Sequence, residues 1–277
     1  MNKAMQLKDR IKNLASKNHI PAQAVLQNFM LERMLERISL SEYREAFVLK
    51  GGMLIASMVG VGSRTTMDMD ATLRNRPLSE ETIREALSAI CAVPLEDGVV
   101  FTLDQILPIR EEDEYGRYRV AVMARYESIN TPLKIDITTG DIITPRAVRY
   151  EYHSFFSDKR IKIWAYNIET ILAEKVETIL RRSVLNTRPR DFYDVYILVK
   201  TKRQKIKAKT FEAALSATSE RRGSVQAVRE KDRILERIRT DPTMQQRWSR
   251  YSRENEYARG IEFDVVIRVI IDILHTG

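Results

Sequence analysis

The sequence predicts an α/β (α+β) protein, in which an N-terminal α/β domain is followed by a basic helical domain. Short β-rich segments separated by turn residues lie between residues 47 and 165, with helical patterns before and among them. After residue 166 the segments are mainly helical. Because 277 residues exceed the usual single-domain size of about 100–200, we place two domains, at residues 1–165 and 166–277.

The composition is that of a water-soluble protein with an ordinary core. Hydrophobic residues make up 44% of the chain and charged residues 30%. Cys91 is the single cysteine, which excludes an internal disulfide and a cysteine-based zinc site, and the three histidines are widely separated. We see neither a secretory signal nor an apolar run long enough to span a bilayer. We therefore expect a cytoplasmic protein without a membrane partner.

The first segments are helical. Within residues 22–38 apolar side chains recur at three- and four-residue spacing, which predicts an amphipathic helix, and Pro21 suits its first turn. The sequence FVLK at 47–50 predicts a strand that ends in two glycines. The apolar segment at 53–60 predicts a helix after them.

Strands and one further helix are expected next. The alternation in TMDMDATL, residues 66–73, predicts a strand. Ser79 is the expected N-cap of a helix, and a later strand passes into a helix with Asn167 as its expected N-cap. The remaining β-rich segments lie at 99–111, 118–127 and 132–140.

The chain from 188 to its end has mostly helical patterns. The segment 263–274 is rich in β-branched residues, so a strand is an alternative there. However, Asp264, Arg268 and Asp272 are spaced four apart and share one stripe only in a helix, so we favour a helix.

Two carboxylates interrupt the apolar strand at 66–73. Asp68 and Asp70 project from the same face of a strand, where they repel each other unless a positive charge lies between them. Mg²⁺ prefers such oxygen ligands. Asp136, in the strand segment LKIDITTG, completes a three-carboxylate metal site if the two strands are neighbours. The alternative is a solvent-facing strand with charged residues and no ligand.

The glycines strengthen the prediction of a binding site. Gly51 and Gly52 close a strand and open a helix, so their backbone can approach a phosphate, with amide donors from the helix N-terminus. The alternative is a tight turn without a ligand. Arg64, which precedes the strand of Asp68, is a further candidate for triphosphate contact, and Lys50 is another phosphate ligand to consider.

One lysine lies on an apolar helix face. In the helix after Asn167, Lys175 falls in the middle of the apolar stripe, while Glu174 and Glu177 are expected to face away. A buried ammonium needs an anion, and Asp191 and Asp194 share a helix face further along the chain. Two interpretations follow, a structural ion pair between helices or a lysine that binds a nucleotide.

The positive charge is concentrated in the second domain. Residues 200–250 contain 15 Lys or Arg against 6 Asp or Glu, whereas the whole chain has a net charge of +8. Such a region suggests a polyanionic partner such as nucleic acid, and the alternative is a solvated helical surface.

The order of these motifs resembles the AbiEii/AbiGii toxin family, nucleotidyltransferases that are the toxins of abortive-infection (type IV) toxin–antitoxin systems. The resemblance covers about residues 25–199. The glycines and D-x-D are common to the DNA polymerase β-like superfamily, whereas Lys175 and the R-x-R-D-x-x-D segment at 188–194 point to this family. Thr66 keeps the hydroxyl of a serine that the family commonly has at this position.

The resemblance implies a nucleotidyltransferase-like mixed β-sheet flanked by helices, and a helical domain that adds a lysine and an aspartate to the cleft. The expected catalytic residues are Asp68, Asp70, Asp136, Lys175 and Asp191, of which the first three bind metal. The expected nucleotide-binding residues are Gly51, Gly52, Arg64, Thr66, Lys175 and Arg190.

The implied activity is transfer of a nucleotide from an NTP to RNA, with tRNA as the first acceptor and one or two Mg²⁺ ions. The resemblance also implies phage defence and an antitoxin that acts without a stable complex. Two alternatives stay open at this stage: nucleotidylation of a protein side chain, and a non-catalytic module that binds nucleic acid.

Overall fold

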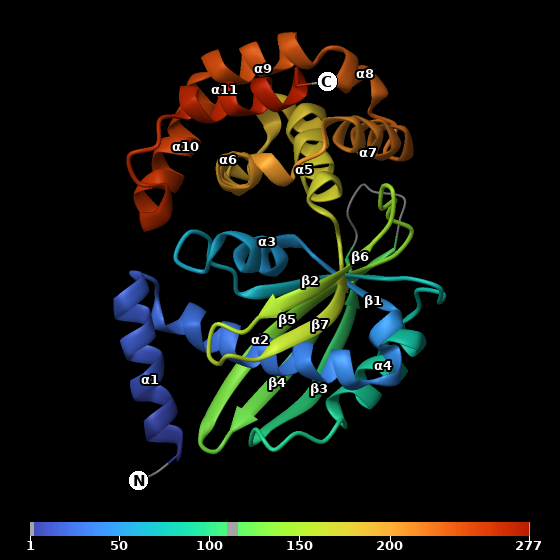
Figure 1. The fold of residues 1–277 in the computed structure, drawn as a ribbon, viewed down its shortest axis with the longest axis vertical. Coiled ribbons are helices and arrows are strands. Elements are labelled where there is room, and N and C mark those ends of the chain that lie inside the picture. The colour runs from blue at the N-terminus through green and yellow to red at the C-terminus, as the bar shows by residue number, and fades with distance from the viewer. Residues whose placement is uncertain (1–2, 110–115, 277) are drawn as a thin grey trace. The chain divides into compact units, whose positions relative to one another are not determined.

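The computed structural model describes residues 3–109 and 116–276, which form two compact units (Figure 1). The first unit contains the described residues up to Asp141 together with Val148–Ala165. The second unit contains Ile142–Ala147 and the described residues from Tyr166 onward.

The first unit is built on a seven-stranded mixed sheet with the strand order β3-β4-β5-β2-β1-β7-β6. Strand β2 runs parallel to β5 and β1 runs parallel to β7, whereas the other neighbours are antiparallel. The strands are β1 (Phe47–Lys50), β2 (Asp68–Leu73), β3 (Val99–Pro108), β4 (Arg117–Tyr126), β5 (Ile129–Thr138), β6 (Val148–His153) and β7 (Arg160–Ala165).

The helices of the first unit pack against this sheet. Helix α2 contacts β2, β5 and β7, whereas α4 contacts β3, and α3 contacts β1 and β2. Met69 and Ile135 alternate with the polar residues of β2 and β5 and are fully buried, so the apolar face of the sheet forms the core. The helices are α1 (Lys3–Asn18), α2 (Ala22–Leu40), α3 (Gly51–Val59) and α4 (Glu80–Cys91), with a 3₁₀ turn η1 (Glu42–Glu45).

The expected elements of the first unit are present. Ser79 caps α4, since its hydroxyl accepts the Thr82 N–H at 3.1 Å. Pro21 is the N-cap residue of α2 and precedes the first turn in which we expected it. Strand β6 was not predicted, and two residues of the expected segment 99–111, Arg110 and Glu111, lie outside the described residues.

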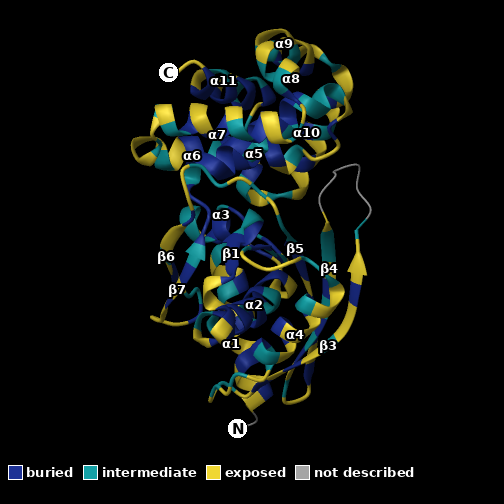
Figure 2. Ribbon diagram, turned by 90° about the vertical axis from the view of Figure 1, so that its right-hand side faces the viewer, coloured by how far each residue is buried: buried dark blue, intermediate teal, exposed yellow. Residues whose placement is uncertain are grey.

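The second unit is helical. Helix α5 is its centre: it packs against α6 and α7 and is mostly buried (Figure 2). As predicted, Asn167 caps α5 by accepting the Thr170 N–H at 2.8 Å. The α-helices are α5 (Ile168–Arg182), α6 (Pro189–Lys202), α7 (Ala208–Arg221), α8 (Val225–Arg229), α9 (Lys231–Thr240), α10 (Pro242–Glu254) and α11 (Phe263–Leu274), with 3₁₀ turns η2 (Ser183–Leu185), η3 (Arg203–Lys205) and η4 (Glu256–Ala258).

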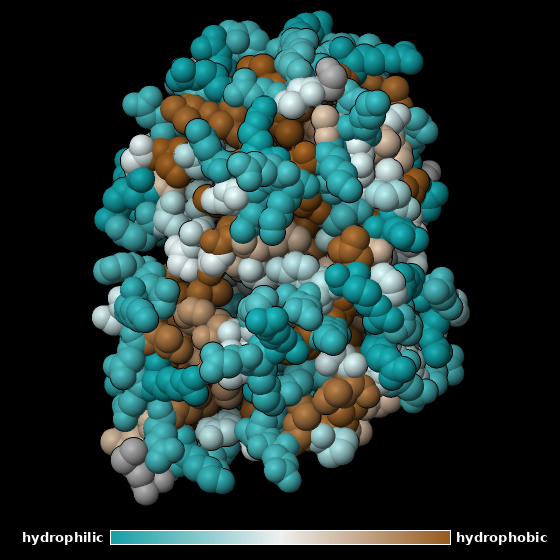
Figure 3. Space-filling view, in the orientation of Figure 1, coloured by the Kyte–Doolittle hydropathy of each residue, from teal (hydrophilic) through white to brown (hydrophobic). Residues whose placement is uncertain are grey.

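Two further features complete the fold. The segment Ile142–Ala147 joins the second unit because Asn167 Nδ2 donates to the carbonyls of Thr144 and Arg146, at 2.8 and 3.0 Å. Segment 263–274 is a helix, as we favoured. Hydrophilic side chains cover most of the face in Figure 3. Among the described helices, none combines the length and apolar character that crossing a bilayer requires.

Candidate active site

Asp68 and Asp70 lie on one face of β2, next to each other and half-buried. Within the described residues, no side chain or main-chain group hydrogen bonds or pairs with either carboxylate. Burial raises the pKa of Asp68, and the neighbouring charge of Asp70 raises it further. Lys134 and Arg119 act on Asp68 through their charges, but among the described residues no cation forms a direct ion pair with either carboxylate. A bound cation would therefore relieve the repulsion between Asp68 and Asp70.

The glycine turn approaches Asp70 closely. Gly51 has a φ of +65°, and a Cβ at this position would lie 2.1 Å from Asp70 Oδ2. A Cβ at Gly52 would lie 2.8 Å from Thr66 Oγ1 and 3.0 Å from Arg64 Nη2. A larger side chain at either position would require its neighbours to move. The β1–α3 turn therefore packs closely against Asp70, Thr66 and Arg64.

The four expected nucleotide-binding residues of the first unit therefore come together beside Asp70. Lys50 is the N-cap residue of α3 and provides no side-chain cap, so the first N–H groups of this helix have no side-chain acceptor there. Such N–H groups, with the guanidinium of the buried Arg64 and the hydroxyl of Thr66, are suited to phosphate oxygens. Their arrangement fits an anion beside the carboxylate pair.

Asp136 lies on the neighbouring strand in register with Asp70, while Lys134 is in register with Asp68. Residues in register share one face of a sheet, so the three aspartates lie on the same face of β2 and β5. The spacing in sequence did not reveal this pairing, which depends on the strand order. The charge of Lys134 lowers the pKa of Asp68, against the larger effects of burial and of Asp70.

Two arginines from β4 hold the Asp136 carboxylate. Arg119 Nε donates to Oδ1 at 2.9 Å, and Arg119 Nη2 and Arg117 Nη2 donate to Oδ2 at 2.9 and 2.7 Å. Asp136 is 4% exposed. Burial raises its pKa, but the hydrogen bonds and charges of the arginines outweigh this effect and hold the pKa below the ordinary value. Asp136 is thus an ion-paired carboxylate in this structure.

The donor chemistry fits a divalent cation at Asp68 and Asp70. Carboxylate oxygens are the ligands that Mg²⁺ prefers, and these two have no competing partner among the described residues. In the described part of the chain, no three His, Cys, Asp or Glu side chains are arranged to hold a metal ion. Both oxygens of Asp136 are instead paired with Arg117 and Arg119.

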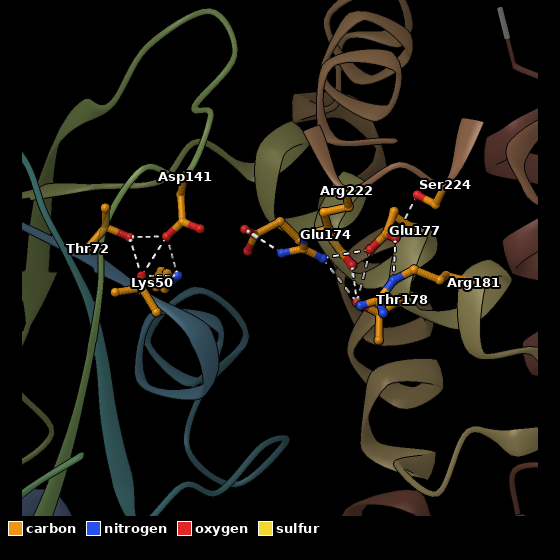
Figure 4. A network of polar contacts seen from close by, with 10 residues as sticks. Lys50, Thr72, Asp141, Glu174, Glu177, Thr178, Arg181, Arg222 and Ser224 are labelled. Atoms are coloured by element: carbon orange, nitrogen blue, oxygen red, sulfur yellow. Dashed lines mark hydrogen bonds and ion pairs between the residues drawn. The ribbon is translucent and has the colours of Figure 1, made fainter. Parts of the chain in front are cut away.

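Lys50 pairs with Asp141 and not with Asp68 or Asp70. Its Nζ lies 2.6 Å from Asp141 Oδ2 and 2.7 Å from Thr138 Oγ1, and Thr72 donates to the same Asp141 oxygen at 2.7 Å (Figure 4). Burial raises the pKa of Asp141, but the charge of Lys50 and the hydrogen bonds from Lys50, Thr138 and Thr72 together outweigh burial and hold the pKa well below the usual range. The network stabilises the start of α3, which weakens Lys50 as a phosphate ligand.

In the second unit, Lys175 bridges two carboxylates of α6. Its Nζ lies 2.6 Å from Asp191 Oδ1 and 3.1 Å from Asp194 Oδ2. The Asp194 side chain is fully buried, whereas that of Lys175 is 22% exposed. Asp191 Oδ2 is buried without a hydrogen-bond partner among the described residues. Arg190, in the first turn of α6, is exposed.

Glu177 corrects one sequence-based expectation. We expected it to face away from the core with Glu174, but it is fully buried and accepts hydrogen bonds from Arg181, Arg222 and Ser224, at 2.8, 2.7 and 2.8 Å (Figure 4). The helical wheel identified the face of α5 that meets α6. It could not show that α7 and α8 cover the opposite face of α5. There the guanidinium of Arg222 pairs with the Glu177 carboxylate and offsets the cost of burying its charge.

The residues missed by sequence reasoning are the partners of the predicted ones. Arg117 and Arg119 alternate on β4 as the aspartates do on β2, so an R-x-R signal was present in the sequence. Asp141 follows β5 after Gly140, and Asp194 was noted only as a neighbour of Asp191. Their importance became visible through the hydrogen bonds they make.

Comparisons with known proteins agree with this architecture. The profile of the nucleotidyl transferase AbiEii toxin family, of type IV toxin–antitoxin systems, matches residues 33–269. The chain is similar to MenT4, a nucleotidyltransferase toxin from Mycobacterium tuberculosis, with a TM-score of 0.51 and 13% identity over 95% of this chain and 97% of that chain. For JHP933 from Helicobacter pylori the TM-score is 0.50 and the identity 15%, over 91% and 92%.

A search of curated proteins gives no match. The two structural likenesses concern the fold, and they confirm the expected nucleotidyltransferase-like mixed sheet with flanking helices. The family profile covers most of the chain and includes both units. The protein therefore belongs to the AbiEii family of nucleotidyltransferase toxins, and it is an enzyme with an NTP substrate and an antitoxin partner.

Proposed function

We propose that this toxin transfers a nucleotide from an NTP to the 3′ end of an RNA, with the tRNA acceptor stem as the first candidate, in a Mg²⁺-dependent reaction. The observation that carries the proposal is the pair Asp68 and Asp70, which has no partner among the described residues and lies against the Gly51–Gly52 turn. Carboxylates that can hold a metal ion beside a glycine turn at a helix N-terminus suit phosphoryl transfer.

Each residue of the first unit has a proposed role. Asp68 and Asp70 would hold Mg²⁺, which when bound neutralises triphosphate charge and makes the α-phosphorus easier to attack. The main-chain N–H groups of the glycine turn, together with Arg64 and Thr66, bind the phosphates and orient them. A side chain at Gly51 or Gly52 would collide with Asp70 or Thr66, so the glycines allow the turn to lie this close to the proposed metal ligands.

The proposed step is an in-line displacement. The acceptor hydroxyl oxygen forms a bond to the α-phosphorus, the bond to the β-phosphate oxygen breaks, and pyrophosphate leaves. Asp136 is the proposed acceptor of the hydroxyl proton. Its low pKa makes it a weak base while Arg117 and Arg119 hold it, so its participation requires at least one of these arginines to release it.

The second unit supplies Lys175, Asp191 and Arg190 in this proposal. Lys175 binds the triphosphate, Asp191 orients the ammonium, and Arg190 adds a phosphate contact. The two carboxylates around Lys175 also support the alternative of a purely structural ion pair.

The choice of acceptor rests on the charge of residues 200–250 and on the family resemblance. Incubation of the toxin with each labelled NTP, Mg²⁺ and total tRNA should give label on RNA, lost when the metal is chelated. Label on protein instead would identify a protein acceptor. Binding to RNA without any transfer, unchanged in an Asp68→Asn/Asp70→Asn variant, would favour the non-catalytic module.

The biological setting is part of the same proposal. We propose that the toxin acts in the cytoplasm in defence against phage, and that its antitoxin opposes it without forming a stable complex. Co-purification of the two proteins at stoichiometric levels would contradict the last point.

A further inference from the structure

The positive charge of the second unit is not evenly available for binding. Residues 200–209, from the end of α6 to the start of α7, contain six Lys or Arg and no Asp or Glu. Residues 225–259, which include α8, α9 and α10, contain nine Lys or Arg against six Asp or Glu. The two segments therefore differ in how much of their charge is balanced locally.

The lysine segment, defined as Lys200, Lys202, Lys205, Lys207 and Lys209, has no acidic partners in the part of the chain that the structure describes. Four of the five side chains are exposed and Lys202 is half-buried. Among the described residues, none of the five ammonium groups takes part in an ion pair or a hydrogen bond. Glu169 reaches the segment, but its buried carboxylate accepts the main-chain N–H of Lys207 at 2.9 Å.

The arginines that follow are mostly engaged. Four exposed or half-buried arginines of the later helices pair with a nearby acid at 2.6–2.8 Å: Arg233 with Glu230, Arg239 with Glu236, Arg250 with Glu254 and Arg259 with Glu256. Local pairing reduces the field that a distant polyanion feels. The available positive charge is thus greatest in the lysine segment.

Helix stability does not explain all of these lysines. Lys200 and Lys202 lie in the last turn of α6, where a cation is favourable. Lys207, in contrast, is the N-cap residue of α7, and Lys209 lies in its first turn, which has no acidic residue. Cations at the positive end of a helix are unfavourable for folding, so a binding role is the better explanation for Lys207 and Lys209. Lys205 is exposed in the preceding turn η3 and adds to the same charge.

We propose that Lys205, Lys207 and Lys209 form a contact surface for the sugar–phosphate backbone of the RNA acceptor, an inference that rests on the proposed function. No aromatic residue lies between 200 and 210 that could stack on a base. The contact is therefore with phosphates, and it positions the RNA without reading its sequence. This surface lies wholly within the second unit.

The test compares two triple variants of the full-length protein that lose the same charge. Binding of fluorescein-labelled tRNA is followed by fluorescence anisotropy over a series of KCl concentrations. For Lys205→Gln/Lys207→Gln/Lys209→Gln we expect the negative slope of the logarithm of the association constant against the logarithm of the salt concentration to become smaller in magnitude by about 2. Each phosphate contact contributes about 0.7–0.9 to that magnitude. The corresponding loss of affinity is about 10- to 100-fold at moderate salt.

The matched control is Arg250→Gln/Arg253→Gln/Arg259→Gln, in which two of the three removed charges are already paired. We expect a change in affinity of less than about 2-fold and an unchanged slope. Thermal melts check that both variants fold. If the lysine variant is unstable, the Lys205→Gln/Lys209→Gln pair replaces it, with an expected fall in slope of about 1.5.

Equal losses in the two triple variants would overturn the inference, because net charge alone would then account for binding. Displacement of labelled tRNA by polyglutamate as readily as by unlabelled tRNA would also overturn it, in favour of an acidic protein partner. Failure of the proposed function would appear differently, as wild-type protein that binds tRNA through these lysines but transfers no nucleotide.

Discussion

Gly51 lies so close to Asp70 that a Cβ at Gly51 would fall 2.1 Å from the Asp70 carboxylate oxygen Oδ2. The contact joins the β1–α3 turn to the carboxylate pair of β2. Residues 53–67 lie between these two motifs in the sequence. The tightness of the contact means that the glycine is needed for the shape of the site, in addition to the positive φ it adopts.

This relationship gives the first prediction. Gly51→Ala should reduce nucleotide transfer by more than about 100-fold, because either the turn or Asp70 must move. Gly223→Ala is the matched control: its φ of +62° is nearly the same, but none of the described residues lies within 4 Å of a Cβ there. The control should cost about 1 kcal/mol in unfolding free energy and keep its activity. Equal activity of the two variants would contradict this account of the turn.

The second prediction concerns the carboxylate pair. Asp68→Asn and Asp70→Asn should each lower transfer by more than about 100-fold, because loss of even an outer-shell partner of a metal ligand costs 10- to 100-fold. Stability without metal should stay the same or rise, since like-charge repulsion is removed. Mg²⁺ should raise the melting temperature of the wild type but not of the variants. A variant that still transfers at the wild-type rate would end the metal-site proposal.

The third prediction tests whether Arg119 restrains Asp136. Arg119→Gln should tighten Mn²⁺ binding by about 5-fold, equivalent to roughly 1 kcal/mol, because a nearby positive charge is lost and Asp136 becomes available. Titration calorimetry with Mn²⁺ measures the affinity directly. The double variant Arg119→Gln/Asp136→Asn should lose most of the gain; if it keeps the gain, the charge of Arg119 acts without Asp136.

The fourth prediction separates structure from catalysis at Lys175. Lys175→Met leaves the fully buried Asp194 without this partner, which should cost about 3 kcal/mol in unfolding free energy. Adding Asp191→Asn and Asp194→Asn should recover most of the stability. If Lys175 binds the triphosphate, transfer should remain absent in the stabilised triple variant. Recovery of activity together with stability would show that the lysine is a structural partner only.

The fifth prediction is a pH dependence of folding. Burial raises the pKa of Asp97, but the paired Arg37, with contacts of 2.7 and 2.9 Å, outweighs this and lowers it. The folded carboxylate therefore binds its proton less tightly than the unfolded one.

The pair of Asp97 and Arg37 stabilises the fold fully at pH values above the ordinary carboxyl pKa of about 4. This stabilisation is lost as the pH falls through the lower pKa of Asp97 in the folded protein. Asp97→Asn should thus lower the unfolding free energy at pH 7 and flatten its decline at acidic pH, measured by urea titrations. A parallel decline in both proteins would rule out this pair as a source of acid sensitivity.

Much of the fold could be predicted because its signals are local. The alternation around Asp68, the glycines after β1 and the caps Ser79 and Asn167 each depend on a few neighbouring residues. The candidate residues could be named for the same reason. Strand β6 escaped prediction because its sequence, VRYEYH, is largely polar and exposed, so it lacks the apolar alternation of a half-buried strand.

The pairing of charges could not be predicted, because it depends on which elements become neighbours. Asp136 pairs with two arginines because β4 lies beside β5. The order of the strands cannot be predicted from the sequence of any single strand. Glu177 is buried because a residue 45 positions later brings a guanidinium to it. Sequence patterns identify charged residues that need partners, but the topology decides which partner each one finds.

The segment Ile142–Ala147 leaves the first unit and joins the second before the chain returns to form β6 and β7. A gene fragment that starts at residue 166 would therefore lack the carbonyls that Asn167 binds at the beginning of α5. Neither half can be obtained by a single cut of the polypeptide. Because the second unit contains residues from two stretches of chain, a fragment of residues 166–277 should be less stable than the same unit in the full-length protein.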